Sequence, residues 1–279
     1  MPFGPLITAE ALRATTGPLR LLDARPGAEG YAAGHLDGAL HADLNTRLSA
    51  ASEPGFDPAR GGRHPLPSLA AWCAQLGAWG IGPETRVVAY DAASGGNAAC
   101  RLWWMLRAVG HQPVAVLDGG LKAALAAGTV PTTVTPPTPA PLPPYPCASW
   151  QRPTVELAAV ERLVQDPAWK VLDVRSRERW RGESETLDPV AGRIPGTVNL
   201  PFAENLDASG RYKSPAALRQ TYLALLGGTP PARLVVHCGS GVTACHTLLA
   251  LELAGLDGAS HYVGSFSEWC RSGRRLGRG

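Results

Sequence analysis

Three sequence pieces occur twice in the same order, and this duplication restricts the fold more than any other feature. The first piece is a strand-like segment ending in Asp-x-Arg, the second is a turn of small residues, and the third is a strand, a glycine-containing loop and an apolar helix. The copies lie at residues 21–25 and 171–175, 34–44 and 192–202, and 86–110 and 233–256. Because the repeat is long, it predicts two similar domains rather than a solenoid.

Short apolar strand patterns alternate with helical patterns in both halves, which predicts an α/β fold with a mostly parallel sheet flanked by helices in each domain. The chain has 279 residues, which is enough for two ordinary domains. The segment 129–146 is rich in proline, which favours extended surface geometry over sheet pairing. We therefore predict domains at 1–128 and 151–279, joined by a semi-rigid linker at 129–150.

Composition and charge argue against several classes of partner. The net charge is only +3 and no basic stripe occurs, so we expect no nucleic-acid partner. No apolar stretch is long enough for a membrane helix, and the first residues do not resemble a signal peptide. The six cysteines form no CxxC pair and no zinc spacing. We expect a reducing, cytoplasmic setting and no metal.

The loop between the strand-like residues 234–236 and the helix-like residues 247–253 carries the strongest chemical signal. It begins with Cys238, and two glycines, Gly239 and Gly241, allow a tight backbone turn. The end of a parallel strand is where open α/β sheets bind ligands, and the free N–H groups of the next helix favour an anion. These features stabilise a thiolate or persulfide, which is the form that nucleophilic cysteine chemistry requires.

The matching loop of the first half has Asp91 in the place of Cys238, followed by residues 92–96, AASGG. The loop pattern is kept but the sulfur nucleophile is missing. We therefore predict a catalytically inactive first domain and an active second domain. Cys100 and Cys245 fall in the helices beyond the two loops, where burial in the core is the favoured interpretation.

The sequence resembles the two-domain rhodanese family, specifically its thiosulfate and 3-mercaptopyruvate sulfurtransferases. The loop CGSGVTA at 238–244 carries the resemblance, supported by GRIPGTVNLP at 192–201 and YVGSFSEW at 262–269. The resemblance covers nearly the whole chain. It implies two tandem rhodanese-like domains and a ping-pong cycle in which Cys238 becomes a persulfide. It also implies no cofactor, a small-molecule sulfur donor, a thiophilic acceptor such as cyanide, a thiol or thioredoxin, and a monomer.

The loop also bears on the choice of donor. Family members that prefer thiosulfate carry cationic residues in the loop, whereas this chain has Gly239 and Ser240 there. A neutral loop with serine is typical of mercaptopyruvate-type members, and the Ser240 hydroxyl could bind the donor thiol or relay a proton. We therefore expect 3-mercaptopyruvate to be preferred, with thiosulfate as the alternative. The backbone of Gly241, Val242 and Thr243 completes the expected binding loop.

Arginines are expected to bind the carboxylate and keto groups of mercaptopyruvate through paired donors. The resemblance assigns this role to Arg179, with Arg181 two residues further on as the alternative. Mercaptopyruvate-type relatives carry a second arginine in this stretch, but here no arginine lies between Arg181 and Arg193. This departure weakens the mercaptopyruvate assignment.

Two other groups of residues have a structural interpretation beside a functional one. His35 matches a family histidine that is proposed to work with the loop serine, but a turn histidine of structural function fits equally well. Asp173 and Arg175, like Asp23 and Arg25, are expected to form internal ion pairs that position loops. His237 precedes Cys238 in the strand, so its side chain should point to the opposite face.

Two other functions compete with sulfur transfer. A cysteine phosphatase needs an arginine six residues after its cysteine to bind phosphate, and this chain has Ala244 there. The second rival is a non-enzymatic module that carries sulfur as a protein persulfide to a dedicated partner. The intact Cys238 loop does not distinguish this rival from an enzyme.

Overall fold

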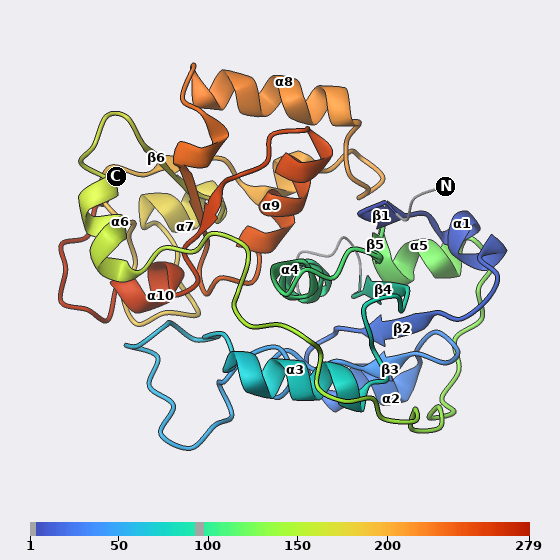
Figure 1. The fold of residues 1–279 in the computed structure, drawn as a ribbon. Helices are drawn as coiled ribbons and strands as arrows, with labels where there is room; N and C mark the ends of the chain where they lie inside the picture. Colours follow the sequence, from blue (N-terminus) through green and yellow to red (C-terminus); the bar gives the residue numbers. More distant parts are fainter. Residues whose placement is uncertain (1–3, 93–97) are drawn as a thin grey trace. The chain divides into compact units, whose positions relative to one another are not determined.

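The computed structural model describes residues 4–92 and 98–279. The chain divides into two compact units (Figure 1). The first unit comprises Met1–Ala50, Pro67–Arg152 and Ala208–Arg211, and the second comprises Ala51–Leu66, Pro153–Asp207 and Tyr212–Gly279. The segment Ala51–Leu66 therefore packs with the second unit, although it lies within the range expected for the first domain.

The first unit contains a five-stranded sheet in the order β1-β5-β4-β2-β3, and every described pairing is parallel. The strands are β1 (Leu6–Ile7), β2 (Arg20–Asp23), β3 (Leu40–His41), β4 (Val87–Tyr90) and β5 (Val114–Leu117). The helices are α1 (Ala9–Ala14), α2 (Ala28–Ala33), α3 (Leu69–Ala78), α4 (Ala99–Ala108) and α5 (Gly120–Ala126). Strands β4 and β5 are buried along their whole length, as expected for central strands of a parallel sheet covered on both faces.

The second unit repeats the plan with a four-stranded parallel sheet in the order β7-β6-β8-β9. Its strands are β6 (Lys170–Asp173), β7 (Val198–Asn199), β8 (Leu234–His237) and β9 (Ser260–His261). Its helices are α6 (Leu157–Leu163), α7 (Arg177–Arg181), α8 (Pro215–Leu226), α9 (Ala244–Leu253) and α10 (Ser265–Trp269), with 3₁₀ turns at Phe202–Asn205 and Pro231–Arg233. Helices α8 and α9 pack against each other (Figure 1).

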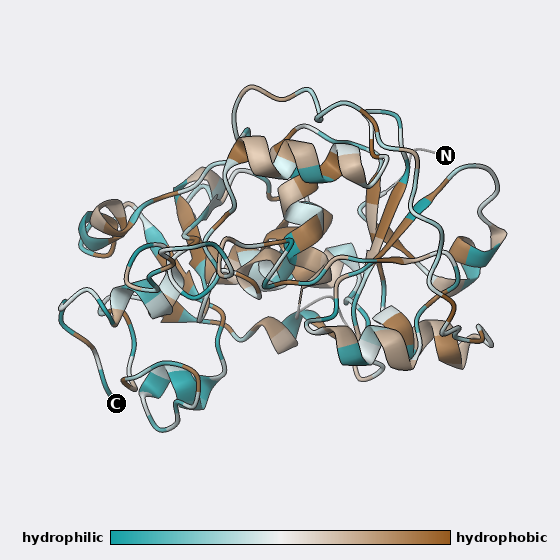
Figure 2. Ribbon diagram, turned by 90° about the horizontal axis from the view of Figure 1, so that it is seen from below, coloured by the Kyte–Doolittle hydropathy of each residue, from teal (hydrophilic) through white to brown (hydrophobic). Residues whose placement is uncertain are grey.

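Apolar side chains hold each sheet to its helices, and the strands are coloured mainly as apolar in Figure 2. In the second unit, one buried cluster joins strand residues to helix and loop residues: Val160, Val171, Ile194, Val235, Tyr262, Phe266 and Trp269. Full burial of side chains of this size stabilises a fold by roughly 2 kcal/mol each, before the loss of chain entropy is counted. The expected fold of two parallel α/β domains is confirmed.

The pairing register of β6 and β8 brings the segments that follow these two strands close together. Strands β6 and β8 run side by side, with Asp173 opposite His237 at their carboxyl ends. The segment that leads into α7 and the loop that begins at Cys238 therefore leave the sheet at the same edge. Open parallel sheets place their ligand sites at this edge.

The proline-rich stretch contains no helix or strand over 133–150 and lies against α3 of its own unit. The N–H groups of Leu142 and Tyr145 donate to the carbonyls of Gly77 and Cys73, both 2.9 Å away. Because Gly77 has no Cβ, the carbonyls of Leu142 and Pro143 can approach closely; a Cβ would lie 2.6 Å from each. The boundaries 1–128, 129–150 and 151–279 remain a prediction.

Candidate active site of the second unit

Cys238 follows directly after β8, and its side chain is almost buried, with 3% of the residue surface exposed. Its N–H donates to Ser265 Oγ at 3.1 Å, and its carbonyl accepts from the N–H of Phe266 at 3.1 Å. The carbonyl of Gly239 accepts from Ser267 N–H at 2.8 Å. The first turn of α10 therefore fixes the start of the loop through three hydrogen bonds.

The loop turns sharply at Gly241, whose φ is +75°. A Cβ there would lie 2.2 Å from the carbonyl oxygen of Val263, so a side chain is excluded by both conformation and space. Helix α9 begins at Ala244, three residues earlier than the apolar pattern indicated. Its amino-terminal end therefore begins within the loop segment, where N–H groups favour an anion. Val242 is buried, and Thr243 is the residue before the helix.

Ser240 contacts a histidine that the sequence analysis did not select. Nδ1 of His64 lies 2.8 Å from Ser240 Oγ, and Ser240 is itself 7% exposed. Nothing in the spacing of the two residues signals this contact, because they are separated by 176 positions. The pairing of a hydroxyl with an imidazole is an arrangement that can move a proton.

The segment that carries His64 is held against the turn before α10. Gly62 has φ +76°, and a Cβ on it would lie 2.3 Å from the carbonyl oxygen of Gly264. The N–H of Gly61 donates to Glu268 Oε1 at 2.8 Å. The same turn therefore positions both the Cys238 loop and the histidine that meets it.

His35 lies in the first unit and is fully buried there. Its Nδ1 is 2.9 Å from the carbonyl of Tyr31, its Nε2 is 3.2 Å from the carbonyl of Val134, and its ring stacks on Tyr31 at 3.9 Å. Both ring nitrogens thus face backbone carbonyls. The contact with Ser240 is made by His64, and the geometry of His35 matches the structural interpretation.

Arg179 is carried by α7 and forms a paired contact with the buried carboxylate of Glu185. Its Nε and Nη2 lie 3.1 and 2.8 Å from Glu185 oxygens. Its Nη2 would be 3.3 Å from a Cβ on Gly239, so the guanidinium borders the loop next to Cys238. Arg181 differs: its side chain is half exposed, and its ion pair with Glu183 spans 3.8 Å. Of the two expected arginines, the structure brings Arg179 to the loop.

The stretch 182–192 lacks the expected second arginine but contributes Asp188, whose carboxylate is buried. Arg63 Nε lies 3.1 Å from it, Arg271 Nη1 lies 2.7 Å from it, and Arg179 Nη2 lies 3.8 Å from it. Burial acts to raise the pKa of Asp188, but the hydrogen bond from Arg271 and the charge of Arg63 outweigh burial and hold the pKa below its usual value.

The Asp-x-Arg pairs are internal, as expected. Arg175 Nη2 lies 2.7 Å from Asp173 and 2.9 Å from the carbonyl of Gly192, and its guanidinium stacks over Phe266 at 3.9 Å. In the first unit, Arg25 makes the same pair of contacts with Asp23 and Gly34, at 2.5 and 2.7 Å. Each arginine thus joins its strand end to the turn of small residues that follows.

His237 is fully buried behind the loop, with Nδ1 3.2 Å from the carbonyl of Cys238 and Nε2 3.8 Å from Asp173. Burial lowers the pKa of His237, although the charge of Asp173 opposes this effect. The neutral imidazole is therefore the favoured form near pH 7. This environment agrees with a packing function.

The equivalent loop in the first unit begins with Asp91, which is buried at the end of β4. Its Oδ2 accepts from the N–H groups of Ala98 and Ala99, at 3.2 and 3.3 Å, at the start of α4. The Asp91 carboxylate therefore binds the amino-terminal end of α4. In the second unit, the loop that begins at Cys238 leads into the amino-terminal end of α9 in the same way. Of the loop residues 92–96, only Ala92 falls within the described part of the chain.

Three further cysteines and histidines near the two loops have packed surroundings. Cys100 and Cys245 are buried in α4 and α9, and His246 stacks on Tyr212 at 4.3 Å. Across residues 4–92 and 98–279, no group of three or more His, Cys, Asp or Glu side chains is arranged to hold a metal ion.

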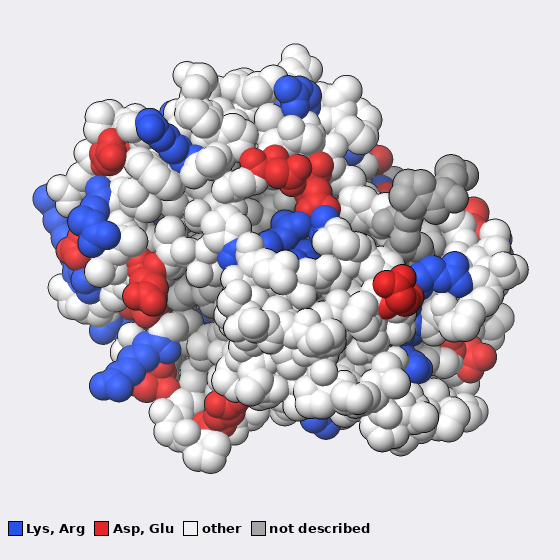
Figure 3. Space-filling view, viewed as in Figure 1, with Lys and Arg blue, Asp and Glu red and all other residues white. Residues whose placement is uncertain are grey.

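No helix in that same part of the chain is long and apolar enough to cross a membrane. On the described surface shown in Figure 3, basic and acidic side chains are interspersed.

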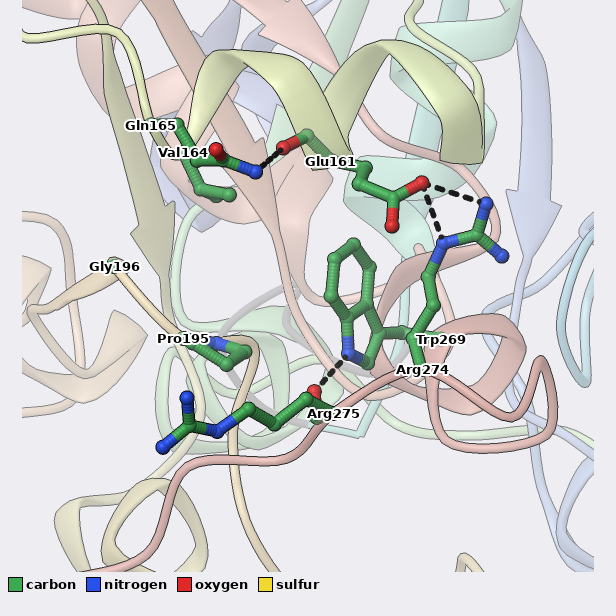
Figure 4. A pocket seen from close by; sticks show the side chains of 8 residues that line it. All are labelled: Glu161, Val164, Gln165, Pro195, Gly196, Trp269, Arg274 and Arg275. Carbon is green, nitrogen blue, oxygen red and sulfur yellow. Dashed lines mark hydrogen bonds and ion pairs between the residues drawn. The ribbon is translucent and has the colours of Figure 1, made fainter.

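A separate surface cavity of about 350 Å³ lies in the second unit (Figure 4). An ion pair between Arg274 and Glu161, 2.8 Å apart, lines it together with Trp269, whose indole N–H donates to the carbonyl of Arg275. No cysteine is among its described lining residues. This cavity is therefore separate from the candidate site at the Cys238 loop.

Comparison with known proteins agrees with this fold. The model of the rhodanese-like domain matches twice, at residues 8–127 and 156–272. A probable 3-mercaptopyruvate sulfurtransferase of Pseudomonas aeruginosa is 41% identical over 99% of this chain and 98% of its own length. The human 3-mercaptopyruvate sulfurtransferase is 35% identical over 94% and 89%, and a putative thiosulfate sulfurtransferase of Mycobacterium tuberculosis is 37% identical over 94% and 92%.

A solved structure of 3-mercaptopyruvate sulfurtransferase from Leishmania major has a TM-score of 0.80 and 28% identity, covering 96% of this chain and 75% of that one. The chain therefore belongs to the rhodanese-like family as a member with two such domains, and it is a sulfurtransferase.

Proposed function

We propose that this enzyme takes sulfane sulfur from 3-mercaptopyruvate onto Cys238 and passes it to a thiophilic acceptor. The observation that carries the proposal is the surroundings of the loop: Cys238 ends a buried parallel strand, Ser240 meets His64 at 2.8 Å, and Arg179 borders Gly239. The cysteine, the hydroxyl–imidazole pair and the guanidinium group that the proposal requires thus lie around one loop. Similarity to proteins named 3-mercaptopyruvate sulfurtransferase supports the same donor.

In the first half-reaction, the Cys238 thiolate attacks the sulfur atom of mercaptopyruvate. The new S–S bond forms as the donor C–S bond breaks, and the bonding electron pair remains on carbon as the enolate of pyruvate. The proton of the donor thiol ends on that carbon, which gives pyruvate and a Cys238 persulfide anion. The N–H groups at the start of α9 would stabilise this anion, because a helix amino-terminal end favours negative charge.

Ser240 and His64 are proposed to carry the proton. The Ser240 hydroxyl would contact the thiol of the donor, and His64 would hold the proton until the carbon takes it. Arg179 would bind the carboxylate or keto oxygen of the donor through its planar fork. The backbone of Gly239, Gly241, Val242 and Thr243 would surround the transferred sulfur.

In the second half-reaction, an acceptor removes the outer sulfur and restores Cys238. Cyanide would leave as thiocyanate. A dithiol such as reduced thioredoxin would be oxidised to a disulfide while the sulfur leaves as hydrosulfide. Neither step requires a metal or an organic cofactor. All six cysteines are free thiols in the structure, which fits a reducing cytoplasmic compartment, and we propose a monomer.

Thiosulfate is the second candidate donor, favoured by one observation. The loop itself is neutral, but the guanidinium groups of Arg63 and Arg179 lie beside Gly239 and would suit a dianion. Attack by Cys238 on the outer sulfur would form the same persulfide and release sulfite. Similarity to a putative thiosulfate sulfurtransferase also supports this reading.

We further propose that the first domain is inactive, since Asp91 stands where Cys238 stands in the second. The test is intact-protein and peptide mass spectrometry after incubation with each donor. One added sulfur atom on the Cys238 peptide, absent in Cys238→Ser, is the expected result. Fast transfer to a protein acceptor with negligible turnover on cyanide would instead favour a sulfur-carrier module.

A further inference from the structure

Gly239, the residue after Cys238, lies between two guanidinium groups that come from distant parts of the sequence. A Cβ built on Gly239 would be 3.2 Å from Arg63 Nη2 and 3.3 Å from Arg179 Nη2. Arg179 was expected at the loop, but Arg63 was not. The side chains of both arginines keep 22% of their surface exposed, so each can still be reached by a small solute.

Arg63 is fixed in this position from two sides. Its backbone lies between Gly62, which packs on Gly264, and His64, which contacts Ser240. Its side chain contacts Asp188 through Nε at 3.1 Å and Nη2 at 3.4 Å. A long side chain that is held in this way loses little further conformational entropy when it binds a ligand.

The charges around the loop do not cancel. The basic side chains of the cluster are Arg63, Arg179 and Arg271, and the acidic ones are Glu185 and Asp188. Three positive charges and two negative charges leave an excess of one positive charge. Arg175 contacts both Asp173 and Glu185, and counting Arg175 together with Asp173 leaves the excess unchanged. This excess stabilises negative charge beside Gly239, whether on the Cys238 sulfur or on a bound donor.

We infer that Arg63 belongs to the donor-binding site: together with Arg179 it binds the anionic group, carboxylate or sulfonate, of the sulfur donor, while Asp188 holds Arg63 in position. This inference rests on the proposed function. It also accounts for the missing arginine of the stretch 182–192, because that stretch supplies the carboxylate that holds an arginine from residue 63. The second cationic group beside the loop is thus Arg63, which comes from the segment 51–66 and not from the stretch 182–192.

The test compares Arg63→Met with Arg60→Met in the full chain. Arg60 carries the same charge in the same segment, but its side chain is 90% exposed and makes only a 3.9 Å pair with Asp57. With either donor, R63M should lose about 10- to 100-fold in kcat/KM, mainly through KM, because a hydrogen bond to a charged ligand group is removed. R60M should match the wild type. A larger loss with mercaptopyruvate than with thiosulfate identifies the carboxylate as the bound group, and the reverse identifies the sulfonate.

A second readout does not depend on turnover. Iodoacetate and iodoacetamide alkylate a thiolate by the same displacement of iodide, but only iodoacetate is an anion. The ratio of their rates at Cys238, followed on its peptide by mass spectrometry, should fall about 10-fold in R63M and stay unchanged in R60M. Arg63→Gln, checked for folding by circular dichroism, gives a second variant with the same loss of charge.

The results of these experiments distinguish a failure of the Arg63 inference from a failure of the proposed function. Equal ratios in R63M, R63Q and R60M would overturn the function of Arg63, even if the wild type forms the persulfide. A wild type that forms no persulfide with either donor would overturn the proposed function, while the alkylation ratio would still report on Arg63.

Discussion

Nδ1 of His64 lies 2.8 Å from Oγ of Ser240, across 176 positions of the chain. The contact joins a segment from the first half of the sequence to the Cys238 loop within one compact unit. The half-chain 151–279 therefore contains the cysteine and the loop but lacks both His64 and Arg63. The second compact unit therefore contains two residues of the candidate site, His64 and Arg63, that the second half of the sequence does not contain.

We expect His64→Asn to lower kcat for mercaptopyruvate by about 100-fold with a small change in KM, because it removes a group that moves a proton but does not hold the donor. The pH dependence of kcat should change as well. Steady-state kinetics across pH 5.5–9 measures both effects. If KM alone rises, His64 binds the donor and does not transfer the proton.

Ser240→Ala and His64→Asn should not be additive, since residues that act as a unit lose their joint effect once either is removed. The double variant is expected to be about as active as the weaker single variant. A double-mutant cycle on kcat provides the measurement. Full additivity would mean that the 2.8 Å contact has no catalytic consequence.

Gly241→Ala should abolish sulfur loading and destabilise the fold by about 3 kcal/mol or more, because the loop would need a strained φ and would have to move away from Val263. Gly273→Ala is the matched control: its φ is +73°, but no atom lies within 4 Å of an added Cβ. The control should cost only about 1 kcal/mol. Urea unfolding of both variants tests this, and equal losses would refute the steric argument.

Stability should fall as the pH drops below about 6.5, partly because of His111. Burial lowers the pKa of His111 to about 4, so between pH 6.5 and 4 the folded protein binds fewer protons than the unfolded chain. The contribution is complete above pH 6.5 and amounts to a loss of about 2 kcal/mol at pH 5. Urea titrations at pH 7.5 and 5 should show this loss. His111→Leu should make the difference smaller; an unchanged difference would exclude His111 as a source.

Much of the fold follows from local sequence patterns. The repeated Asp-x-Arg segments, the buried strands and the Cys238 loop are short-range signals, and the parallel sheets and the Arg175–Asp173 pair appear where the sequence indicated. The apolar run 247–253 predicted helix α9, and the structure extends this helix back to Ala244, so that it begins at the end of the loop.

The site was only partly predictable. Arg179 and Ser240 lie on elements that the loop pattern and the resemblance identified, but His64 and Arg63 reach the loop through the packing of Gly62 on Gly264. That contact joins two glycines that lie far apart in the sequence, and no local sequence pattern predicts it. The sequence alone shows that no arginine lies in 182–192. The contact by which Asp188 of this stretch holds Arg63 is seen only in the structure.

The donor choice is tested by kcat/KM for 3-mercaptopyruvate and thiosulfate measured side by side, with cyanide as acceptor. We expect mercaptopyruvate to be preferred, because the loop residues Gly239 and Ser240 are neutral. A preference for thiosulfate would mean that the arginines beside the loop decide the donor, and the mercaptopyruvate assignment would be withdrawn.

The central claim is that sulfur resides on Cys238, and mass spectrometry of donor-treated protein tests it most directly. The account predicts one added sulfur atom on the peptide that contains Cys238, its removal by cyanide, and no addition in a folded Cys238→Ser variant. Sulfur found on another cysteine, or turnover that persists in Cys238→Ser, would contradict the account.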